Sequence, residues 1–391
     1  MIEGSESTEG GKLLHYGMVG GGPGSFIGAV HRNALSFSGL ADIAAGCFSD
    51  IPDEIEITGK VLRLDPSRVY NNFDEMAEKE ADRPDKIDFA VVAAPNRVHF
   101  AACKAFLEKG ISVMCEKPLA TTADDAIALQ RIAEKNNCLL GVSYTYTGHV
   151  MAKEARAIIR SGQIGGVIMV MGEYPQEWLI EPVEKTGQRQ AAWRTDPKQA
   201  GGSNCTGDIG THIENIVHYM TGLKIKKLCA NLEIIGEGRQ LDTNAEILLK
   251  YDNGASGMYW CSQVAIGYDN GLKVRIFGTK GAIEFEQEKS NYLKVTMKGQ
   301  APQIYSRGHG YIQPEAASFS RIPAGHPEGY HEAYANIYSS FCAAVAKKLA
   351  GGKIDELDFD YPTAEMGIAG VKFVEKCLES SNKGAVWVDL D

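Results

Sequence analysis

Residues 13–28 read LLHYGMVGGGPGSFIG, an apolar run that leads directly into a cluster of glycines. The apolar part is expected to form a strand, and a helix is expected to begin at Phe26. Glycine lacks a Cβ, so the backbone can approach a pyrophosphate closely, and the helix N-terminus offers free N–H groups. Gly20 and Gly22 match the first two glycines of a G-x-G-x-x-G fingerprint, and Gly28 takes the place of the third after an insertion. The stretch predicts a dinucleotide-binding turn; the alternative is a glycine-rich turn without a ligand.

The rest of the N-terminal part alternates short apolar runs with segments of helical spacing. The expected strands are 13–19, 42–48, 87–94, 112–115 and 139–144, and the expected helices are one from 26 and those at 53–63, 98–109 and 122–136. This alternation is typical of βαβ units and a parallel sheet. We predict an α/β fold with a doubly wound Rossmann sheet over residues 13–145, preceded by a flexible tail at 1–12.

The pattern changes after residue 145, where strands follow one another. The expected strands are 165–174, 225–236, 243–251, 255–263, 272–278, 281–286 and 292–298, and the expected helices are 150–160, 208–221, 331–349 and 363–379. Asn253-Gly254, between two of these strands, is a strong hairpin signal. Consecutive strands favour an antiparallel sheet with helices on one face. Residues 146–391 are therefore expected to form an α+β domain with a large open, mainly antiparallel sheet.

Composition excludes several classes of protein. The 391 residues are 44% hydrophobic and 23% charged, as in ordinary globular proteins, and the formal net charge is −10. An acidic chain is a poor partner for nucleic acid, and no apolar run is long enough for a membrane span. The nine cysteines are scattered without a C-x-x-C pair, so a zinc site is not expected and a reducing compartment is favoured. The polar N-terminus then makes the cytoplasm the expected location.

The cofactor is expected to lie along the carboxyl ends of the first strands. The residues expected to contact it in the first turn are Gly20, Gly22, Gly24, Ser25, Phe26 and Ile27. Asp50 follows the second strand, where a carboxylate binds the ribose 2′-OH of NAD and repels the 2′-phosphate of NADP. NAD is therefore favoured over NADP, although Asp50 as an ordinary loop acid remains open. After the third strand, Ala94, Pro95, Asn96 and His99 are further candidates, with His99 also readable as a packing residue.

Glu116-Lys117-Pro118 follows another strand at the same edge of the sheet. Proline keeps Lys117 out of the helical region, which restrains where its ammonium points. A lysine here can donate to a substrate hydroxyl and stabilise developing negative charge on oxygen. Glu116 and Lys117 are counted with the cofactor site, and Lys117 is also a catalytic candidate; a surface lysine in a turn is the alternative.

A helix expected over 208–221 carries a second group of candidates. Its polar stripe comprises Asp208, His212, Asn215 and Tyr219, which share one face at helical spacing. Histidine titrates near neutrality, so His212 can accept the proton that an alcohol loses when its carbon gives up hydride. Asp208 can bind a neighbouring hydroxyl and bias the imidazole. The alternative is an ordinary Asp–His pair on a helix surface.

The glycine loop, Ala-Pro-Asn-x-x-His, Glu-Lys-Pro and Gly-Asp-x-Gly-x-His occur in an order that resembles the Gfo/Idh/MocA oxidoreductase family, over about residues 13–385. The resemblance implies a Rossmann domain and a second domain with an open sheet, commonly used to form a homodimer or homotetramer. It maps the family's catalytic lysine, aspartate and histidine to Lys117, Asp208 and His212. The enlarged glycine loop is a departure that leaves the phosphate contacts open.

The resemblance also implies a sugar-sized pocket between the domains. The candidates for substrate binding are Tyr146, His149, Trp193, Arg194, Asp208, His212 and His326. The expected activity is hydride transfer between nicotinamide and a ring hydroxyl or ketone of a cyclic polyol or sugar, such as an inositol, a pyranose or a glycoside. Two alternatives stay open: an NAD-dependent glycoside hydrolase that works by transient oxidation, and a non-catalytic sensor of dinucleotide or sugar.

Overall fold

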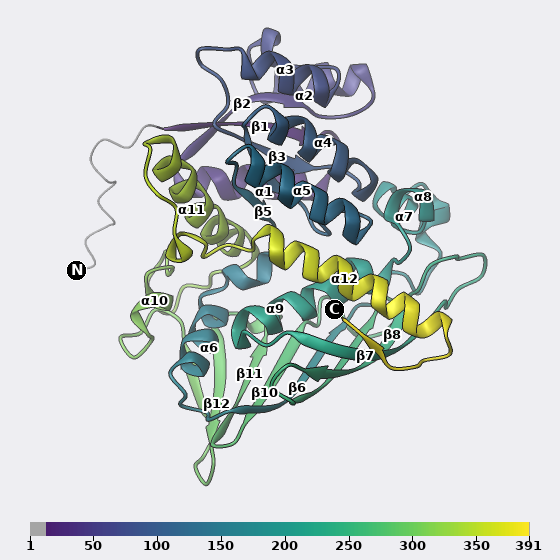
Figure 1. The fold of residues 1–391 in the computed structure, drawn as a ribbon, viewed down its shortest axis with the longest axis vertical. Coiled ribbons are helices and arrows are strands. Elements are labelled where there is room, and N and C mark those ends of the chain that lie inside the picture. The colour runs from purple at the N-terminus through teal and green to yellow at the C-terminus, as the bar shows by residue number, and fades with distance from the viewer. Residues whose placement is uncertain (1–12, 391) are drawn as a thin grey trace.

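The computed structural model describes residues 13–390, so the tail expected at 1–12 lies outside the described residues. Its first sheet has five parallel strands in the order β2-β1-β3-β4-β5 (Figure 1). These strands are β1 (Leu14–Gly20), β2 (Ala41–Cys47), β3 (Phe89–Ala93), β4 (Ser112–Cys115) and β5 (Leu140–Val142). The accompanying helices are α1 (Phe26–Ser38), α2 (Pro52–Val61), α3 (Phe73–Ala81), α4 (Asn96–Glu108) and α5 (Ala123–Lys135). The doubly wound sheet is confirmed, and α3 is an addition to the expected helices.

The second sheet has nine strands in the order β13-β12-β11-β10-β6-β9-β8-β7-β14. Their bounds are β6 (Val167–Pro175), β7 (Ile225–Glu233), β8 (Asn244–Tyr251), β9 (Ser256–Ser262), β10 (Lys273–Gly278), β11 (Gly281–Glu286), β12 (Tyr292–Met297), β13 (Gln303–Ser306) and β14 (Val388–Asp389). The β6–β9 pair is parallel and the others are antiparallel. The mainly antiparallel sheet is confirmed, while the short edge strands β13 and β14 were not expected.

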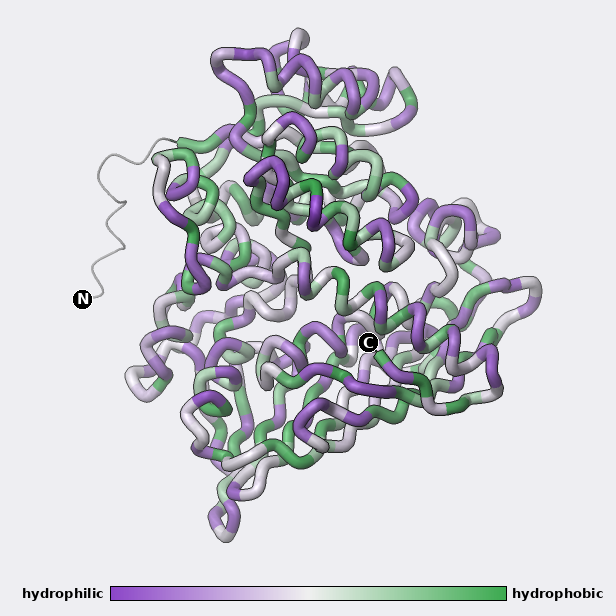
Figure 2. Tube along the Cα trace, viewed as in Figure 1, coloured by the Kyte–Doolittle hydropathy of each residue, from purple (hydrophilic) through white to green (hydrophobic). Residues whose placement is uncertain are grey.

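Helices cover one face of the large sheet. They are α6 (Val150–Arg160), α9 (Thr211–Thr221) and α12 (Ala364–Asn382), which lie above the sheet in Figure 1. Apolar residues of these helices and of the strands' inner face form one buried cluster. Along β8 burial alternates from residue to residue, so that the other face of the sheet is open. In Figure 2 hydrophobic stretches, coloured green, are interspersed with hydrophilic ones along these helices and strands.

The closing part of the chain returns to the first domain. Helix α11 (Tyr330–Leu349) packs beside α1, and its apolar residues share a buried cluster with β1, α1 and β3. The division at residue 145 stays a prediction, but it would assign to the second domain a helix that packs on the first sheet. The short helices α7 (Arg189–Arg194), α8 (Pro197–Ala200) and α10 (Pro314–Ala317) complete the fold.

Within residues 13–390, no helix combines the length and apolar character that crossing a membrane would require. The same part of the chain contains no group of three or more His, Cys, Asp or Glu side chains arranged to hold a metal ion. The cytoplasmic location stays a prediction.

Candidate active site

The glycine loop joins β1 to α1 in a tight, backbone-lined turn. A Cβ at Gly20 would lie 2.3 Å from the carbonyl oxygen of Ala93, and one at Gly28 would lie 2.3 Å from Cα of Gly21. Gly28 therefore allows the helix to pack closely on the turn, which is the role of the third glycine in the fingerprint. Ser25 caps α1 through an acceptor bond from the Gly28 N–H. The turn thus fits a dinucleotide pyrophosphate at the start of α1.

One cavity of about 1110 Å³ runs from this turn into the second domain. The expected residues that line it are Gly20, Gly22, Gly24, Ser25, Phe26, Ile27, Asp50, Ala94, Pro95, Asn96, Glu116, Lys117, Tyr146, Trp193, Arg194, Asp208 and His212. The cofactor candidates and the three catalytic candidates therefore share one continuous space. Three expected residues, His99, His149 and His326, are not part of its lining.

His99 is fully buried beneath the cavity wall. Its Nδ1 lies 2.7 Å from the carbonyl oxygen of Pro118, and its Nε2 lies 2.8 Å from that of Ala94. The ring therefore ties the Glu-Lys-Pro turn to the end of β3. This geometry corresponds to the packing interpretation, so the expectation that His99 contacts the cofactor is corrected.

Glu116 faces inward and joins three elements. Its Oε1 accepts hydrogen bonds from His31 of α1 at 2.9 Å, Ser143 at 2.5 Å and Tyr334 of α11 at 2.8 Å. Burial alone would raise the pKa of Glu116, but His31, the charge of Lys117 and the Ser143 hydroxyl lower it to about 2. The carboxylate thus stays ionised and anchors the backbone that carries Lys117, whose N–H is 3.2 Å from Oε2.

Lys117 and Asp208 form an ion pair across the domains. The Lys117 Nζ donates to Oδ1 and to the backbone oxygen of Asp208, both at 2.7 Å. Arg194 Nε lies 3.3 Å from Oδ2, the other carboxylate oxygen. Burial would raise the pKa of Asp208, but the charges of Lys117 and Arg194 overcome it and hold the pKa well below its usual range. Since an ammonium has three donors, one Lys117 N–H remains for a substrate oxygen.

The segment around Asp208 is a π-helical turn, Thr206–Gly210, which precedes α9. Buried Asp242 holds it by accepting from the N–H of Asn204 at 2.8 Å, the N–H of Thr206 at 2.7 Å and the Thr206 hydroxyl at 2.8 Å. Gln263 donates to Asp208 Oδ2 at 3.0 Å and accepts from Asn204 at 2.6 Å. Sequence reasoning missed Asp242, Asn204 and Gln263, because each comes from a different segment and none lies in a motif.

His212 lies in the first turn of α9, beside three tyrosines. Its ring centroid lies 4.7 Å from that of Tyr146, 5.7 Å from that of Tyr144 and 6.1 Å from that of Tyr174. Burial, and then the positive charge of Lys117, lower the pKa of His212 to about 3. The imidazole is thus a neutral base throughout the physiological range, rather than a group that titrates near neutrality. Of the expected polar stripe, Asp208 and His212 line the cavity, whereas Asn215 does not.

Trp193 and Arg194 lie at the C-terminal end of α7 and line the cavity. The Arg194 guanidinium stacks on the Trp193 ring at 4.3 Å from its centroid. At the other end of α7, Arg189 donates to the Pro23 carbonyl at 3.1 Å and pairs with Glu54 at 3.1 Å. The enlarged glycine loop therefore contacts the second domain, a contact that the sequence did not predict.

The two remaining histidine candidates lie elsewhere. His149 is buried behind Tyr146, with the rings stacked at 6.2 Å, and burial lowers its pKa to about 4. His326 is exposed, and its carbonyl accepts from Arg307. The expectation that both contact substrate is corrected: Tyr146 screens the first, and the second belongs to a surface turn. The wall contains instead several residues that sequence reasoning missed: Tyr174, Gln176, Asn270, Gln287 and Tyr330.

Two family models match the chain, one for each sheet. Residues 14–144 match the oxidoreductase family with an NAD-binding Rossmann fold. Residues 152–284 match the GFO/IDH/MocA C-terminal domain.

Individual proteins are similar over the whole length. The crystal structure of an inositol dehydrogenase homolog complexed with NAD+ from Azotobacter vinelandii is 38% identical, with both chains covered to 100% and a TM-score of 0.93. A structure of an inositol dehydrogenase homolog from that organism, complexed with NADH and myo-inositol, is 37% identical with a TM-score of 0.89, covering 96% of this chain and 97% of that one. The uncharacterized oxidoreductase YfiI of Bacillus subtilis (strain 168) is 35% identical, with 97% of each chain covered.

Proposed function

Because this chain belongs to the Gfo/Idh/MocA family of oxidoreductases with an NAD-binding Rossmann domain, we propose that it is an NAD-dependent dehydrogenase of a cyclic polyol or sugar. The observation that carries the proposal is the Lys117–Asp208 ion pair beside neutral His212, in one cavity with the glycine loop. An acid/base group and a fixed oxygen-binding cation are what oxidation of an alcohol requires. The similarity to an inositol dehydrogenase homolog with bound myo-inositol supports the polyol class.

The three residues divide the work of proton transfer. The free Lys117 N–H holds the substrate hydroxyl and stabilises negative charge that develops on its oxygen. His212 takes the hydroxyl proton, and returns it when the reaction runs toward the alcohol. Asp208 keeps the ammonium in place through the 2.7 Å bond. NAD, when bound, supplies the nicotinamide carbon that accepts or returns the hydride.

The proposal is tested by absorbance at 340 nm with NAD or NADP over a panel of inositols, free hexoses and hexosides. A rise with one class of cyclic polyol and one dinucleotide is expected. Hydrolysis of a glycoside without net NADH, or dinucleotide binding without turnover on any member of the panel, would overturn the proposed dehydrogenase.

Asp50 is proposed to select NAD. It is exposed and lines the cavity just beyond β2, so its carboxylate would repel a 2′-phosphate there. Asp50→Ala is expected to lower the ratio of kcat/KM for NAD to that for NADP by at least about tenfold, because each 1.4 kcal/mol of repulsion removed is a factor of ten. The matched control is Asp53→Ala, an exposed neighbour outside the cavity lining. An unchanged ratio in Asp50→Ala would remove Asp50 from the cofactor site.

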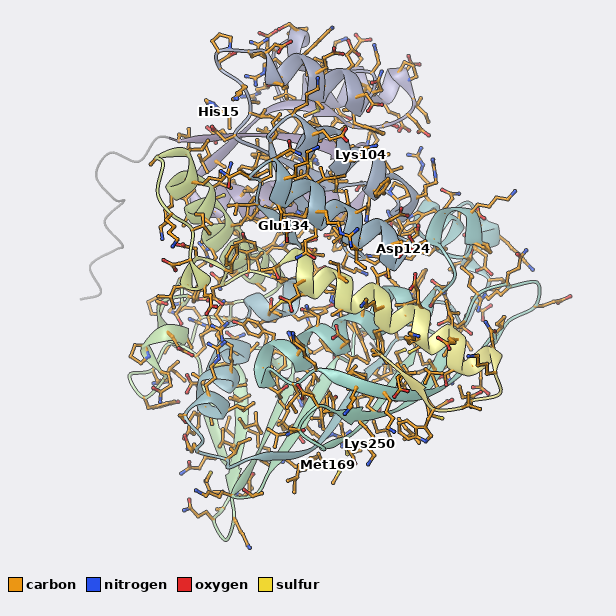
Figure 3. All side chains as sticks on the ribbon, viewed as in Figure 1. His15, Lys104, Asp124, Glu134, Met169 and Lys250 are labelled. Atoms are coloured by element: carbon orange, nitrogen blue, oxygen red, sulfur yellow. The ribbon has the colours of Figure 1, made fainter. Side chains whose placement is uncertain are left out.

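The open face of the large sheet is proposed to pair with a second copy of the chain. Leu248 and Met258 are cross-strand partners exposed to 48% and 43%, and Met169 on β6 is exposed to 44%. Figure 3 shows Met169 on the outer face, away from the covering helices. On the same face, Glu173 pairs with Arg275 at 3.0 Å, so this face carries a negative and a positive charge as well as apolar side chains. Apolar side chains with balanced charges suit a self-complementary interface.

The proposed pairing of two chains through this sheet face predicts that a charged substitution there lowers the mass of the assembly. Leu248→Glu is expected to lower the mass measured by light scattering from a dimer or tetramer to a smaller species, because it places a charge at the buried centre of the interface. Val61→Glu, an exposed position at the end of α2 in the first domain, is the control. A wild-type monomer, or an unchanged mass in Leu248→Glu, would contradict the proposed interface.

A further inference from the structure

Two tyrosines and an asparagine form a closed ring of hydrogen bonds in the cavity wall. The Tyr146 and Tyr174 hydroxyl oxygens lie 2.5 Å apart. Tyr174 donates to Asn270 Oδ1 at 2.6 Å, and Asn270 Nδ2 donates to the Tyr146 oxygen at 3.3 Å. All three residues line the cavity that holds His212. The ring of bonds is therefore part of the surface that a substrate meets.

A tryptophan outside the cavity lining fixes the orientation of the amide. The Trp178 indole Nε1 is only a donor, and it lies 3.0 Å from Gln176 Oε1. The Gln176 oxygen must face Trp178, so its NH2 group must face Asn270, where it donates to Oδ1 at 2.9 Å. Because the Asn270 oxygen faces Gln176, the Asn270 NH2 group must point the opposite way. It donates to the Tyr146 oxygen and to Gln287 Oε1, each at 3.3 Å. One donor-only group thus determines the orientation of both amides.

The direction of each hydroxyl follows from the amide orientation. The Asn270 oxygen can only accept, so Tyr174 must donate its single proton there. Tyr174 then has no proton for Tyr146, so the 2.5 Å bond must carry the proton of Tyr146. Burial raises the pKa of both tyrosines, so both stay protonated at neutral pH. Both hydroxyl protons are committed inside the ring, and each oxygen retains lone-pair capacity.

The position of the ring relates it to the reacting carbon. The Tyr146 and Tyr174 rings lie 4.7 and 6.1 Å from the His212 ring, measured between centroids. A substrate whose reacting hydroxyl is held by Lys117 and His212 therefore presents a neighbouring ring carbon to this wall. Buried oxygens that can only accept favour a donor on that carbon, because an acceptor placed there would face their lone pairs and find no proton on either hydroxyl.

We infer that Tyr146, Tyr174 and Asn270 form an acceptor-only wall that selects substrates with a second free hydroxyl beside the carbon that is oxidised. The inference rests on the proposed polyol dehydrogenase and deepens it. It specifies a vicinal diol as the substrate class and rejects a ring in which that neighbouring position is a ketone, an ether or a deoxy carbon.

The test uses the polyol that the wild-type enzyme oxidises and its monodeoxyfluoro analogues, each with one hydroxyl replaced by fluorine. Fluorine is close to a hydroxyl in size but cannot donate. At one position next to the oxidised carbon, the replacement is expected to lower the wild-type kcat/KM by about 100-fold or more, since a site built around a hydrogen bond strongly rejects the analogue that lacks it.

Two variants identify the wall as the cause. Tyr174→Phe frees the Tyr146 proton to point into the cavity, so the penalty at that position should fall at least about tenfold. Trp178→Phe removes the donor that sets the amide orientation without changing a residue of the cavity lining, and is expected to lower the same penalty. Trp387→Phe, at an exposed position near the C-terminus, is the control and should keep it.

The outcomes separate this inference from the proposed function. Turnover of a polyol without a position-specific fluorine penalty, or a penalty unchanged in both variants, would overturn the acceptor wall and leave the dehydrogenase intact. Lack of turnover on every polyol by the wild-type enzyme would overturn the proposed function and the wall with it. Thermal melting identifies a variant that fails to fold, and Trp178→Phe then decides alone if Tyr174→Phe is that variant.

Discussion

His212→Ala is expected to lower turnover about 10²–10⁴-fold, the range that general acid–base catalysis contributes. Its ring lies in the wall of the cavity, close to Tyr146 and to the Lys117–Asp208 pair. Dinucleotide binding should persist, because the glycine loop is formed by the first domain. The measurement is kcat by absorbance at 340 nm, with NADH binding followed separately by fluorescence. His326→Ala is the matched control, since that histidine is exposed and lies outside the cavity lining.

The same residue predicts the shape of the pH profile. Burial, reinforced by the Lys117 charge, lowers the pKa of His212 to about 3, so the base is lost only when pH falls toward that value. The wild-type kcat/KM should therefore show no acid limb from His212 between pH 5 and 8. A limb centred near pH 6.5, the ordinary value for histidine, would contradict the neutral, desolvated imidazole. Full activity in His212→Ala would remove it from the mechanism altogether.

Local patterns in the sequence were enough to predict the parallel sheet of the first domain. The strand–glycine–helix stretch and the alternation that follows it recur as β1, α1 and the parallel sheet, because both depend on short-range spacing of apolar residues. The same holds for the long strands of the second sheet. The edge strands β13 and β14 span four and two residues, too few to show periodicity.

The candidate site was predictable only where a motif carries the residue. Lys117, Asp208 and His212 lie in such motifs, and the structure brings them to one cavity. The expected helix from 208 instead begins as a π-helical turn, because Asp242 binds the backbone of residues 204 and 206 from a distant segment. A long-range contact of this kind leaves no local periodicity.

Three of the predicted histidines show that position in the sequence alone does not identify a site residue. His99, His149 and His326 follow strands or turns in positions that suggested a site, yet the first is bonded to two backbone carbonyls, the second is screened by Tyr146 and the third is exposed. Which side of a turn a side chain occupies depends on tertiary packing. Composition and spacing do not encode it.

Lys117→Ala is expected to lower kcat about 10²–10³-fold. Removal of a single hydrogen-bond donor to a negatively charged oxygen in a transition state has an effect of this size. It has a second effect, because Asp208 loses a partner at 2.7 Å while it stays in contact with Arg194 and Gln263. A buried charge that loses its partner destabilises the fold, here by up to about 3 kcal/mol. Without the ammonium, burial is less opposed and the pKa of Asp208 should rise.

A double variant separates the catalytic role of Lys117 from its structural one. In Lys117→Ala/Asp208→Asn the uncompensated carboxylate is removed, so the free energy of unfolding should recover toward that of the wild type. Turnover should not recover, because the donor to the substrate oxygen is still missing. Lys104→Ala, an exposed lysine on the first domain (Figure 3), controls for loss of a positive charge. If stability and turnover recover together in the double variant, Lys117 acts by holding the structure rather than by binding the reacting oxygen.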